Sequence, residues 1–309
     1  GRREAAREEA EPKGLLHGLW ETLKTVFWAL LIAGAFRTVF FQPFWIPSGS
    51  MKDTLLIGDF LFVDKMAYGY SYASCPSVRI AAIGLDIGAD DLCGWLPWGE
   101  GRLLGSDPLR GDVVVFRHPV TGVDFIKRLI GLPGDRIQMR GGRLFLDPRE
   151  PGGPEAQVAE FVPAGLEPAG DFVEAYAPQG PQGLMPTCRD RPQGAGGDCV
   201  SDRYLETLPG TPLADGTLSP PVTHSVLDIG TTVADDTGVF TVPEGHFFFM
   251  GDNRDNSTDS RFPQAARGVG FVPLADLVGR ADRVMFSSAG RSMFSVWAWR
   301  ADRFFHPID

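Results

Sequence analysis

Two serines separated by one glycine, Ser48 and Ser50 in the stretch IPSGSMKDTL, suit nucleophilic chemistry. A serine hydroxyl becomes a nucleophile when a base lies within hydrogen-bond reach. The five histidines are His17, His118, His224, His246 and His306. His118 stands between an arginine and a proline at the end of an expected strand, where a turn or surface role fits better than a base. The sequence therefore does not favour a Ser-His-Asp arrangement.

Lys127 is the alternative base. If the stretch DFIKRLI is a strand, Phe125, Lys127 and Leu129 share one face, so apolar neighbours frame the lysine. Burial disfavours the ammonium form, and a pKa drop of about 2–3 units corresponds to about 3–4 kcal/mol. A neutral amine could then act as a general base near pH 7. This strand alone also allows a lysine that reaches solvent along a strand edge.

The loop GDNRDNSTDSR, residues 251–261, is dense in side chains that hydrogen-bond their own backbone. A calcium loop is excluded by spacing, because Arg254 and Ser260 occupy positions that need a ligand and a glycine. Asn256 begins a three-residue glycosylation pattern, which stays open. A rigid polar loop that orients a neutral lysine is the interpretation that fits best.

The composition favours a β-rich globular chain. The net charge of -10 argues against a nucleic-acid surface, and 38 glycines with 25 prolines favour short strands and turns. The four cysteines form no CxxC pair, so no zinc site is expected. They fall into two local pairs, which predict disulfides Cys188–Cys199 and Cys75–Cys93 in an oxidising compartment. Four unrelated thiols remain the alternative.

An apolar segment near the N-terminus predicts a membrane anchor over residues 25–45. The uncharged run 25–36 is short for a bilayer and needs Lys24 or Arg37 to reach a headgroup layer. The basic residues of segment 1–24 would hold it in the cytoplasm. Two alternatives are a buried core helix and a cleaved signal, because Ala33-Gly34-Ala35 has the A-x-A form.

The remainder divides into a core over 46–148, an inserted loop-rich β region over 149–237, and a second core part over 238–309. Strands are expected at GDVVVFRHP, at DFIKRLI, and in a hairpin at Arg136–Met139 and Arg143–Leu146. Aromatic residues gather near the C-terminus and could rest at a membrane interface, or form a short core-packed helix. These residues are Met293, Phe294, Trp297, Trp299, Phe304 and Phe305, with Phe40, Phe41, Phe44 and Trp45.

Four blocks of the sequence resemble bacterial type I signal peptidases. They are PSGSMKDTLLIGDFLFVDKMAYG, GDVVVFRHP, DFIKRLIGLPGDRI and GDNRDNSTDSR, in the family's order. The resemblance implies a mainly β, antiparallel catalytic core with a β-rich insertion and one N-terminal transmembrane helix. It implies an endopeptidase, without cofactor or metal, that removes signal peptides from preproteins after A-x-A. It places a monomer in the bacterial inner membrane, with the N-terminus cytoplasmic and the catalytic domain periplasmic.

The resemblance also assigns roles by position, with Ser50 as nucleophile and Lys127 as general base. Ser48 and the Ser50 N–H would bind the oxyanion, and Ser257 would orient the Lys127 amine. The residues expected to form an ion-pair cluster are Arg128, Asp259 and Arg261. The residues expected to line the substrate pockets and hold the substrate are Phe44, Ile46, Pro47, Met51, Leu55, Asp124, Phe125 and Ile126.

One position departs from the family pattern, because Asp53 stands where the pattern has proline. That change puts the backbone after the nucleophile in question, but not the chemistry. Two rival functions are a self-cleaving repressor-type Ser/Lys protease, which would need a DNA-binding domain, and a non-enzymatic anchored β domain. The joint presence of Ser50, Lys127 and Ser257 counts against the second.

Overall fold

The computed structural model describes most of the 309-residue chain. The described residues are 15–39, 41–75, 78–80, 84–88, 91, 102, 105–147, 162–179, 183, 185–192, 194, 196–290 and 295–308.

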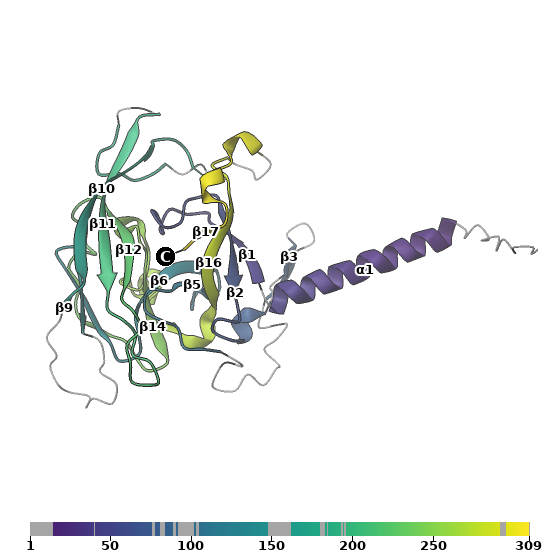
Figure 1. Cartoon of the computed structure of the whole chain (residues 1–309), viewed down its shortest axis with the longest axis horizontal. Coiled ribbons are helices and arrows are strands. Elements are labelled where there is room, and N and C mark those ends of the chain that lie inside the picture. The colour runs from purple at the N-terminus through teal and green to yellow at the C-terminus, as the bar shows by residue number, and fades with distance from the viewer. Residues whose placement is uncertain are drawn as a thin grey trace, which may run out of the picture.

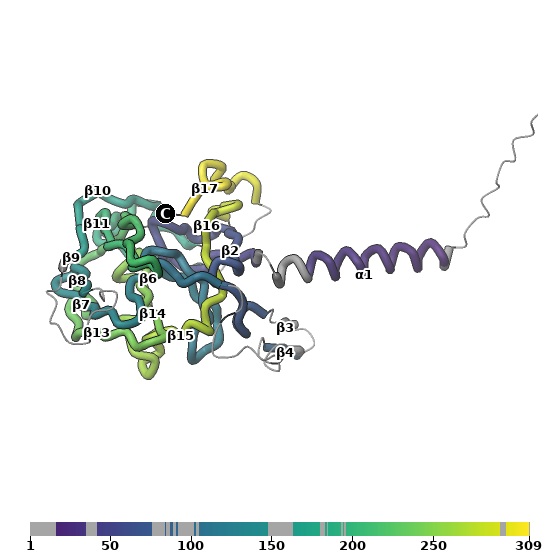
Figure 2. The backbone as a smooth tube through the Cα atoms, turned by 60° about the horizontal axis from the view of Figure 1, so that its bottom comes forward, coloured from purple at the N-terminus to yellow at the C-terminus, as the bar shows by residue number. Residues whose placement is uncertain are grey.

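In the described part of the chain, one long helix, α1 (Leu15–Val39), projects away from a β-rich body (Figures 1 and 2). Within the described residues, no helix combines the length and the apolar character that crossing a bilayer requires. The helix includes charged residues near its start, where Glu21 and Lys24 form an ion pair of 2.8 Å one turn apart.

The predicted anchor over residues 25–45 thus does not coincide with one element. The helix starts earlier than expected, and its C-terminal end is followed by strand β1 (Phe41–Trp45). Pro43 cannot continue a helix, and it is tolerated in β1 because this strand lies at the edge of its sheet.

The body is built on an eight-stranded sheet whose neighbouring strands pair antiparallel in the order β1-β2-β16-β5-β6-β14-β15, with β17 also pairing with β16. Their bounds are β2 (Asp59–Asp64), β5 (Val113–Arg117), β6 (Asp124–Gly131), β14 (His246–Met250), β15 (Val272–Pro273), β16 (Leu277–Ser287) and β17 (His306–Pro307). The prediction of a mainly β antiparallel fold is confirmed, as are the strands expected at GDVVVFRHP and DFIKRLI.

A smaller four-stranded sheet contains the predicted hairpin, now seen as β7 (Arg136–Arg140) and β8 (Arg143–Asp147). Gly141 and Gly142 connect them with φ of 53° and 74°, a backbone region that glycine enters without strain. The other members are β9 (Val162–Pro163) and β13 (Phe240–Thr241), while β3 (Val78–Ile80) and β4 (Leu85–Ile87) pair separately.

Three long strands lie in the described part of the region 149–237. They are β10 (Gly165–Ala175), β11 (Asp198–Leu208) and β12 (Val222–Asp228), paired antiparallel in that order, and we call them the inserted sheet. The predicted disulfide between Cys188 and Cys199 is present. Cys75 is also disulfide-bonded, but its predicted partner Cys93 lies outside the described residues.

Short 3-10 helices complete the described elements. They are η1 (Tyr72–Ser74), η3 (Arg254–Asn256), η4 (Gln264–Ala266), η5 (Leu274–Asp276), η6 (Val296–Ala298) and η7 (Ala301–Arg303). The first of them follows β2, and η6 and η7 occupy the aromatic C-terminal segment. In that segment, Met293 and Phe294 lie outside the described residues, as does Phe40 before β1.

Candidate active site

Ser50, in the turn that follows β1, lies next to Lys127 in strand β6 of the main sheet. Lys127 Nζ donates a hydrogen bond of 2.6 Å to Ser50 Oγ, although the two residues are 77 positions apart. Both side chains are buried, with 7% and 4% of their surface exposed. This is the geometry that a serine nucleophile and an amine base require.

Lys127 comes from the middle of β6, with β5 on one side and β14 on the other. Its Nζ lies 5.5 Å from the centre of the Phe125 ring, as expected for two residues on one strand face. Burial lowers the pKa of Lys127 to about 8, against the opposite pull of Asp259 and Asp252. The alternative of a solvent-reaching lysine is therefore wrong, since this amine is enclosed.

The carboxylates around Lys127 already have partners of their own. Asp252 receives two hydrogen bonds from Arg128, of 2.9 and 2.8 Å, and Asp259 pairs with Arg261 at 2.9 Å. The Arg261 guanidinium overcomes the effect of burial and keeps the pKa of Asp259 below its usual value. Arginines balance these charges, and the two carboxylates raise the pKa of Lys127 by less than burial lowers it.

The predicted ion cluster is thus only partly correct. Asp259 and Arg261 pair as expected, but Arg128 pairs with Asp252, which we did not single out. The sequence also did not point to the pair between Glu206 in β11 and Arg254 in the 251–261 loop, whose side chains form a hydrogen bond of 2.9 Å.

Another buried residue, His224, lies beside Glu206 and Asp252. Its Nε2 lies 3.5 Å from Glu206 and 3.8 Å from Asp252. Burial, with Arg128 and Arg254 nearby, lowers its pKa well below the usual value, so the ring is neutral at pH 7. The network joins β6, the 251–261 loop and the inserted sheet.

The 251–261 loop is fastened directly to the serine turn. Asn253 donates from its backbone to the Ser50 carbonyl at 3.1 Å and from its amide side chain to the Gly49 carbonyl at 3.0 Å. Gly251 permits the close approach, because a Cβ there would lie 2.3 Å from Ser257 Oγ and 2.5 Å from the Ser50 carbonyl oxygen.

The two remaining serines differ in their surroundings. Ser48 is exposed two positions before Ser50, and the Ser50 N–H donates no hydrogen bond to any described residue. Ser257 is buried close to Gly251. Its Oγ nevertheless has no partner with hydrogen-bond geometry in the described part of the chain, so the expected bond to Lys127 is not formed.

Most of the predicted pocket residues gather around the nucleophile. Ile46, Met51 and Leu55 are buried in one apolar cluster, with Phe44 and Ile126 packed against it. Pro47, by contrast, is exposed.

The neighbouring residues 117–125 have other partners. Phe125 packs against the ring of Phe116, and the Asp124 carboxylate lies 3.6 Å from Arg117. His118 is a turn residue, as predicted, but it is buried. Its Nδ1 accepts hydrogen bonds from the Val120 and Thr121 N–H groups, so it is not available as a base.

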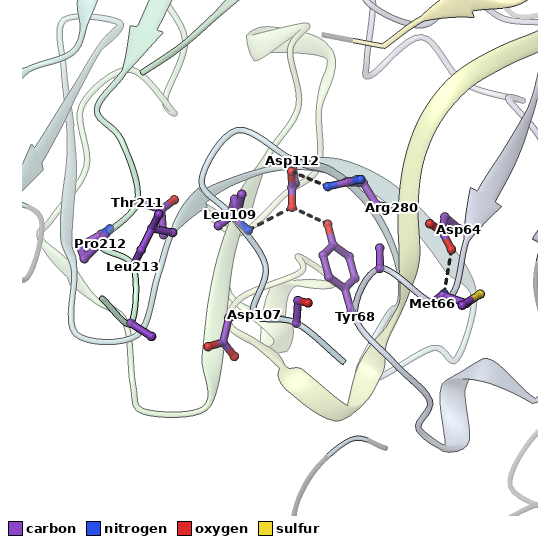
Figure 3. Close-up of a pocket in the computed structure, with 13 residues that line it drawn as sticks. Asp64, Met66, Tyr68, Asp107, Leu109, Asp112, Thr211, Pro212, Leu213 and Arg280 are labelled. Atoms are coloured by element: carbon purple, nitrogen blue, oxygen red, sulfur yellow. Dashed lines mark hydrogen bonds and ion pairs between the residues drawn. The ribbon is translucent and has the colours of Figure 1, made fainter. Parts of the chain in front are cut away.

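A separate cavity of about 550 Å³ lies away from these residues, between the end of β2, the segment before β5 and the segment after β11 (Figure 3). Tyr68 donates a hydrogen bond of 2.8 Å to Asp112 in its wall. Neither Ser50 nor Lys127 lines it, so this cavity is not the catalytic centre.

Replacing Lys127 with methionine is expected to stabilise the fold at pH 7. The folded-state pKa of about 8 lies below the unfolded value of about 10.4, so keeping this lysine costs up to about 3 kcal/mol below pH 8. The unfolded state binds the extra proton between pH 8 and 10.4, so wild-type stability rises over that window. Urea unfolding of both proteins from pH 6 to 11 should show an advantage of Lys127→Met that disappears above about pH 10.5. A difference independent of pH would contradict a depressed pKa.

The comparisons with known proteins agree with a hydrolytic site. A family model described as "Signal peptidase, peptidase S26" matches residues 19–286. Because the match covers most of the sequence, the chain belongs to this family and is a serine endopeptidase.

Individual relatives carry a more particular name. A signal peptidase I from Rickettsia typhi is 32% identical over 265 residues, which cover 84% of this chain and 77% of the relative. A signal peptidase I from Rickettsia canadensis is 31% identical over 271 residues, covering 86% and 79%. A crystal structure of a signal peptidase I from Enterococcus faecalis matches 57% of this chain and 97% of its own, with 22% identity and a TM-score of 0.25, which is too low to support an argument.

Proposed function

We propose that this chain is a signal peptidase that cleaves preproteins after small residues, with Ser50 as nucleophile and neutral Lys127 as general base. The observation that carries the proposal is the 2.6 Å hydrogen bond between their buried side chains. Membership of the signal peptidase family supports the preprotein substrate.

The geometry supports a two-stage reaction. As Ser50 Oγ attacks the scissile carbonyl carbon, Lys127 Nζ takes its proton, and the carbonyl oxygen becomes an oxyanion held by the Ser50 N–H and the Ser48 hydroxyl. The Lys127 ammonium then gives this proton to the leaving amine, so that the C–N bond breaks and an acyl-enzyme remains. Lys127, neutral again, activates the water that releases the signal peptide.

The selection of small residues is assigned to the apolar cluster near Ser50. Met51 and Leu55 are packed in this cluster, with at most 1% of either exposed. A closely packed interior does not readily open for a large side chain, so this packing would favour small residues next to the scissile bond.

Association with a membrane is the second part of the proposal. Helix α1 exposes large apolar side chains along its length, including Phe27 at 58%, Leu30 at 68% and Ile32 at 65%. Trp297 and Phe305 near the C-terminus are 85% and 63% exposed. Apolar surface of this extent favours a lipid environment, with the aromatic rings at the interface.

A chain of aromatic contacts links the start of the body to its end. Trp45 contacts Phe60, which contacts Phe286, and Phe286 in turn contacts Trp299 and Phe304. The C-terminal segment is therefore packed on β16 and close to β1 and β2, so the exposed rings lie on a fixed surface and not on a free tail.

A preprotein with alanine at positions -3 and -1 tests the specificity. We expect the purified full-length chain in detergent to release a product whose new N-terminus follows the A-x-A sequence. Phenylalanine at -1 should reduce kcat/KM at least 100-fold, because the site cannot enlarge without opening the apolar cluster. Mass spectrometry identifies the cut, and equal cleavage of the two substrates would contradict the assigned pocket.

A further inference from the structure

The two residues that follow Ser50-Met51 both reach the inserted sheet. Lys52 is buried, and its Nζ donates to both carboxylate oxygens of Glu174 in β10, each at 2.7 Å. The same ammonium donates to the side-chain oxygen of Gln179 at 2.8 Å. The side chains of the ion pair are only 5% and 17% exposed, so water screens this contact little.

Asp53 makes the adjoining contacts with the other two strands of the sheet. Its Oδ2 lies 3.4 Å from a guanidinium nitrogen of Arg203 in β11 and accepts a hydrogen bond of 3.2 Å from Ser225 Oγ in β12. Consecutive residues of the serine turn therefore contact all three strands of the inserted sheet, at positions between 122 and 172 residues away.

These contacts act on the backbone that carries the nucleophile. Lys52 N–H donates to the Gly49 carbonyl at 3.2 Å, and the Lys52 side chain packs against Gly49, where an added Cβ would lie 3.1 Å from its Cε. Met51 fastens the same turn to the apolar cluster on the other side. Ser50 is thus held between an apolar anchor and an ionic anchor.

The inserted sheet supports the second catalytic segment as well. Leu227 in β12 donates from its backbone to the Asp252 carbonyl at 2.8 Å, and Ile229 N–H donates to the Asp255 carboxylate at 2.9 Å. The same sheet therefore contacts both segments that meet at Ser50, the serine turn and the 251–261 loop.

We propose that the inserted sheet positions the nucleophile for catalysis, through the Lys52–Glu174 ion pair and the Asp53 contacts. This inference rests on the proposed role of Ser50. Lys52 is a positioning residue, since it acts on Ser50 through the turn. A hydrogen bond as short as that between Ser50 and Lys127 requires both groups to be held within a fraction of an ångström, and a small misplacement slows the chemical step more than binding.

Four variants test the proposal in the full-length chain, with steady-state cleavage of an A-x-A preprotein. Lys52→Met keeps the length of the side chain but removes the ionic anchor, and we expect kcat to fall about tenfold or more with KM changed less than about twofold. Glu174→Gln should have a similar effect. The reversed pair Lys52→Glu with Glu174→Lys should recover most of the lost kcat, because the anchor is restored. Gln179→Ala is a milder change and should give a smaller loss of kcat. It provides the test if the other variants fold poorly.

Arg189→Gln is the matched control, since Arg189 contacts Asp202 in the same sheet but lies on its exposed surface, away from the serine turn. It should leave kcat unchanged. The proposal fails if Lys52→Met and Gln179→Ala both match this control, or if the two single losses simply add in the reversed pair. Ser50→Ala separates a failure of the positioning role from a failure of the proposed function. An inactive Ser50→Ala beside a fully active Lys52→Met overturns only the positioning role, whereas an active Ser50→Ala overturns the proposed function.

Discussion

Ser50→Ala is expected to abolish preprotein cleavage, with a fall in kcat of at least about 10⁴-fold. The variant loses the atom that forms the acyl-enzyme, while the turn stays fastened by Met51, Asn253 and the inserted sheet. Binding of the substrate should therefore persist, and KM should change little. Single-turnover cleavage followed by mass spectrometry measures the loss.

Removal of both members of the pair provides the control on this result. Ser50→Ala and Lys127→Met act on one step, so the kcat of the double variant should be about as low as that of either single variant. It should not be lowered by the product of the two single losses. Additive losses would mean that the two side chains contribute to different steps. Substantial cleavage by Ser50→Ala would show that another residue is the nucleophile.

A loss of activity below pH 8 is the second large effect. The base works only as the neutral amine, and with a pKa of about 8 about a tenth of Lys127 is neutral at pH 7 and about a hundredth at pH 6. We therefore expect kcat/KM to fall about tenfold for each pH unit below 8, and to level off above it. The measurement is kcat/KM from pH 5.5 to 9.5 on a substrate without titrating groups near the cut.

Asp252→Asn tests whether the titration of Lys127 causes this fall in kcat/KM at low pH. Its carboxylate raises the pKa of Lys127, and its removal also leaves the Arg128 charge unbalanced. Both effects disfavour the ammonium form of Lys127, so the fall in kcat/KM should move to lower pH. If kcat/KM falls at the same pH as in the wild type, or at a higher pH, then a group other than Lys127 controls this pH dependence.

The sequence predicted the parts of the fold that have local signatures. The hairpin at Gly141-Gly142 and the strand around Lys127 follow from turn residues and alternation, which neighbouring residues decide. The start of α1 was missed because the prediction followed uncharged residues, whereas the helix accommodates Glu21 and Lys24 on its exposed surface.

The partners in the site were harder to foresee. Arg128 pairs with Asp252 at a separation of 124 residues, and Lys52 pairs with Glu174 at 122. No periodicity or turn pattern connects such positions, because tertiary packing alone brings them together. Ser50 and Lys127 are likewise far apart in the sequence, by 77 positions, and only the family resemblance selected them as a pair.

A direct titration of Lys127 tests the central claim most closely. The chain has only the lysines Lys13, Lys24, Lys52, Lys65 and Lys127, so NMR of the protein labelled with ¹³C at lysine Cε gives few signals. Lys52, Lys65 and Lys127 are buried, and replacing each in turn with methionine identifies its signal by the loss of that signal. We predict a titration midpoint of about 8 for Lys127. A midpoint near the ordinary value of about 10.4 would contradict the account, because less than about a thousandth of the amine would then be neutral at pH 7, against about a tenth for a midpoint of about 8.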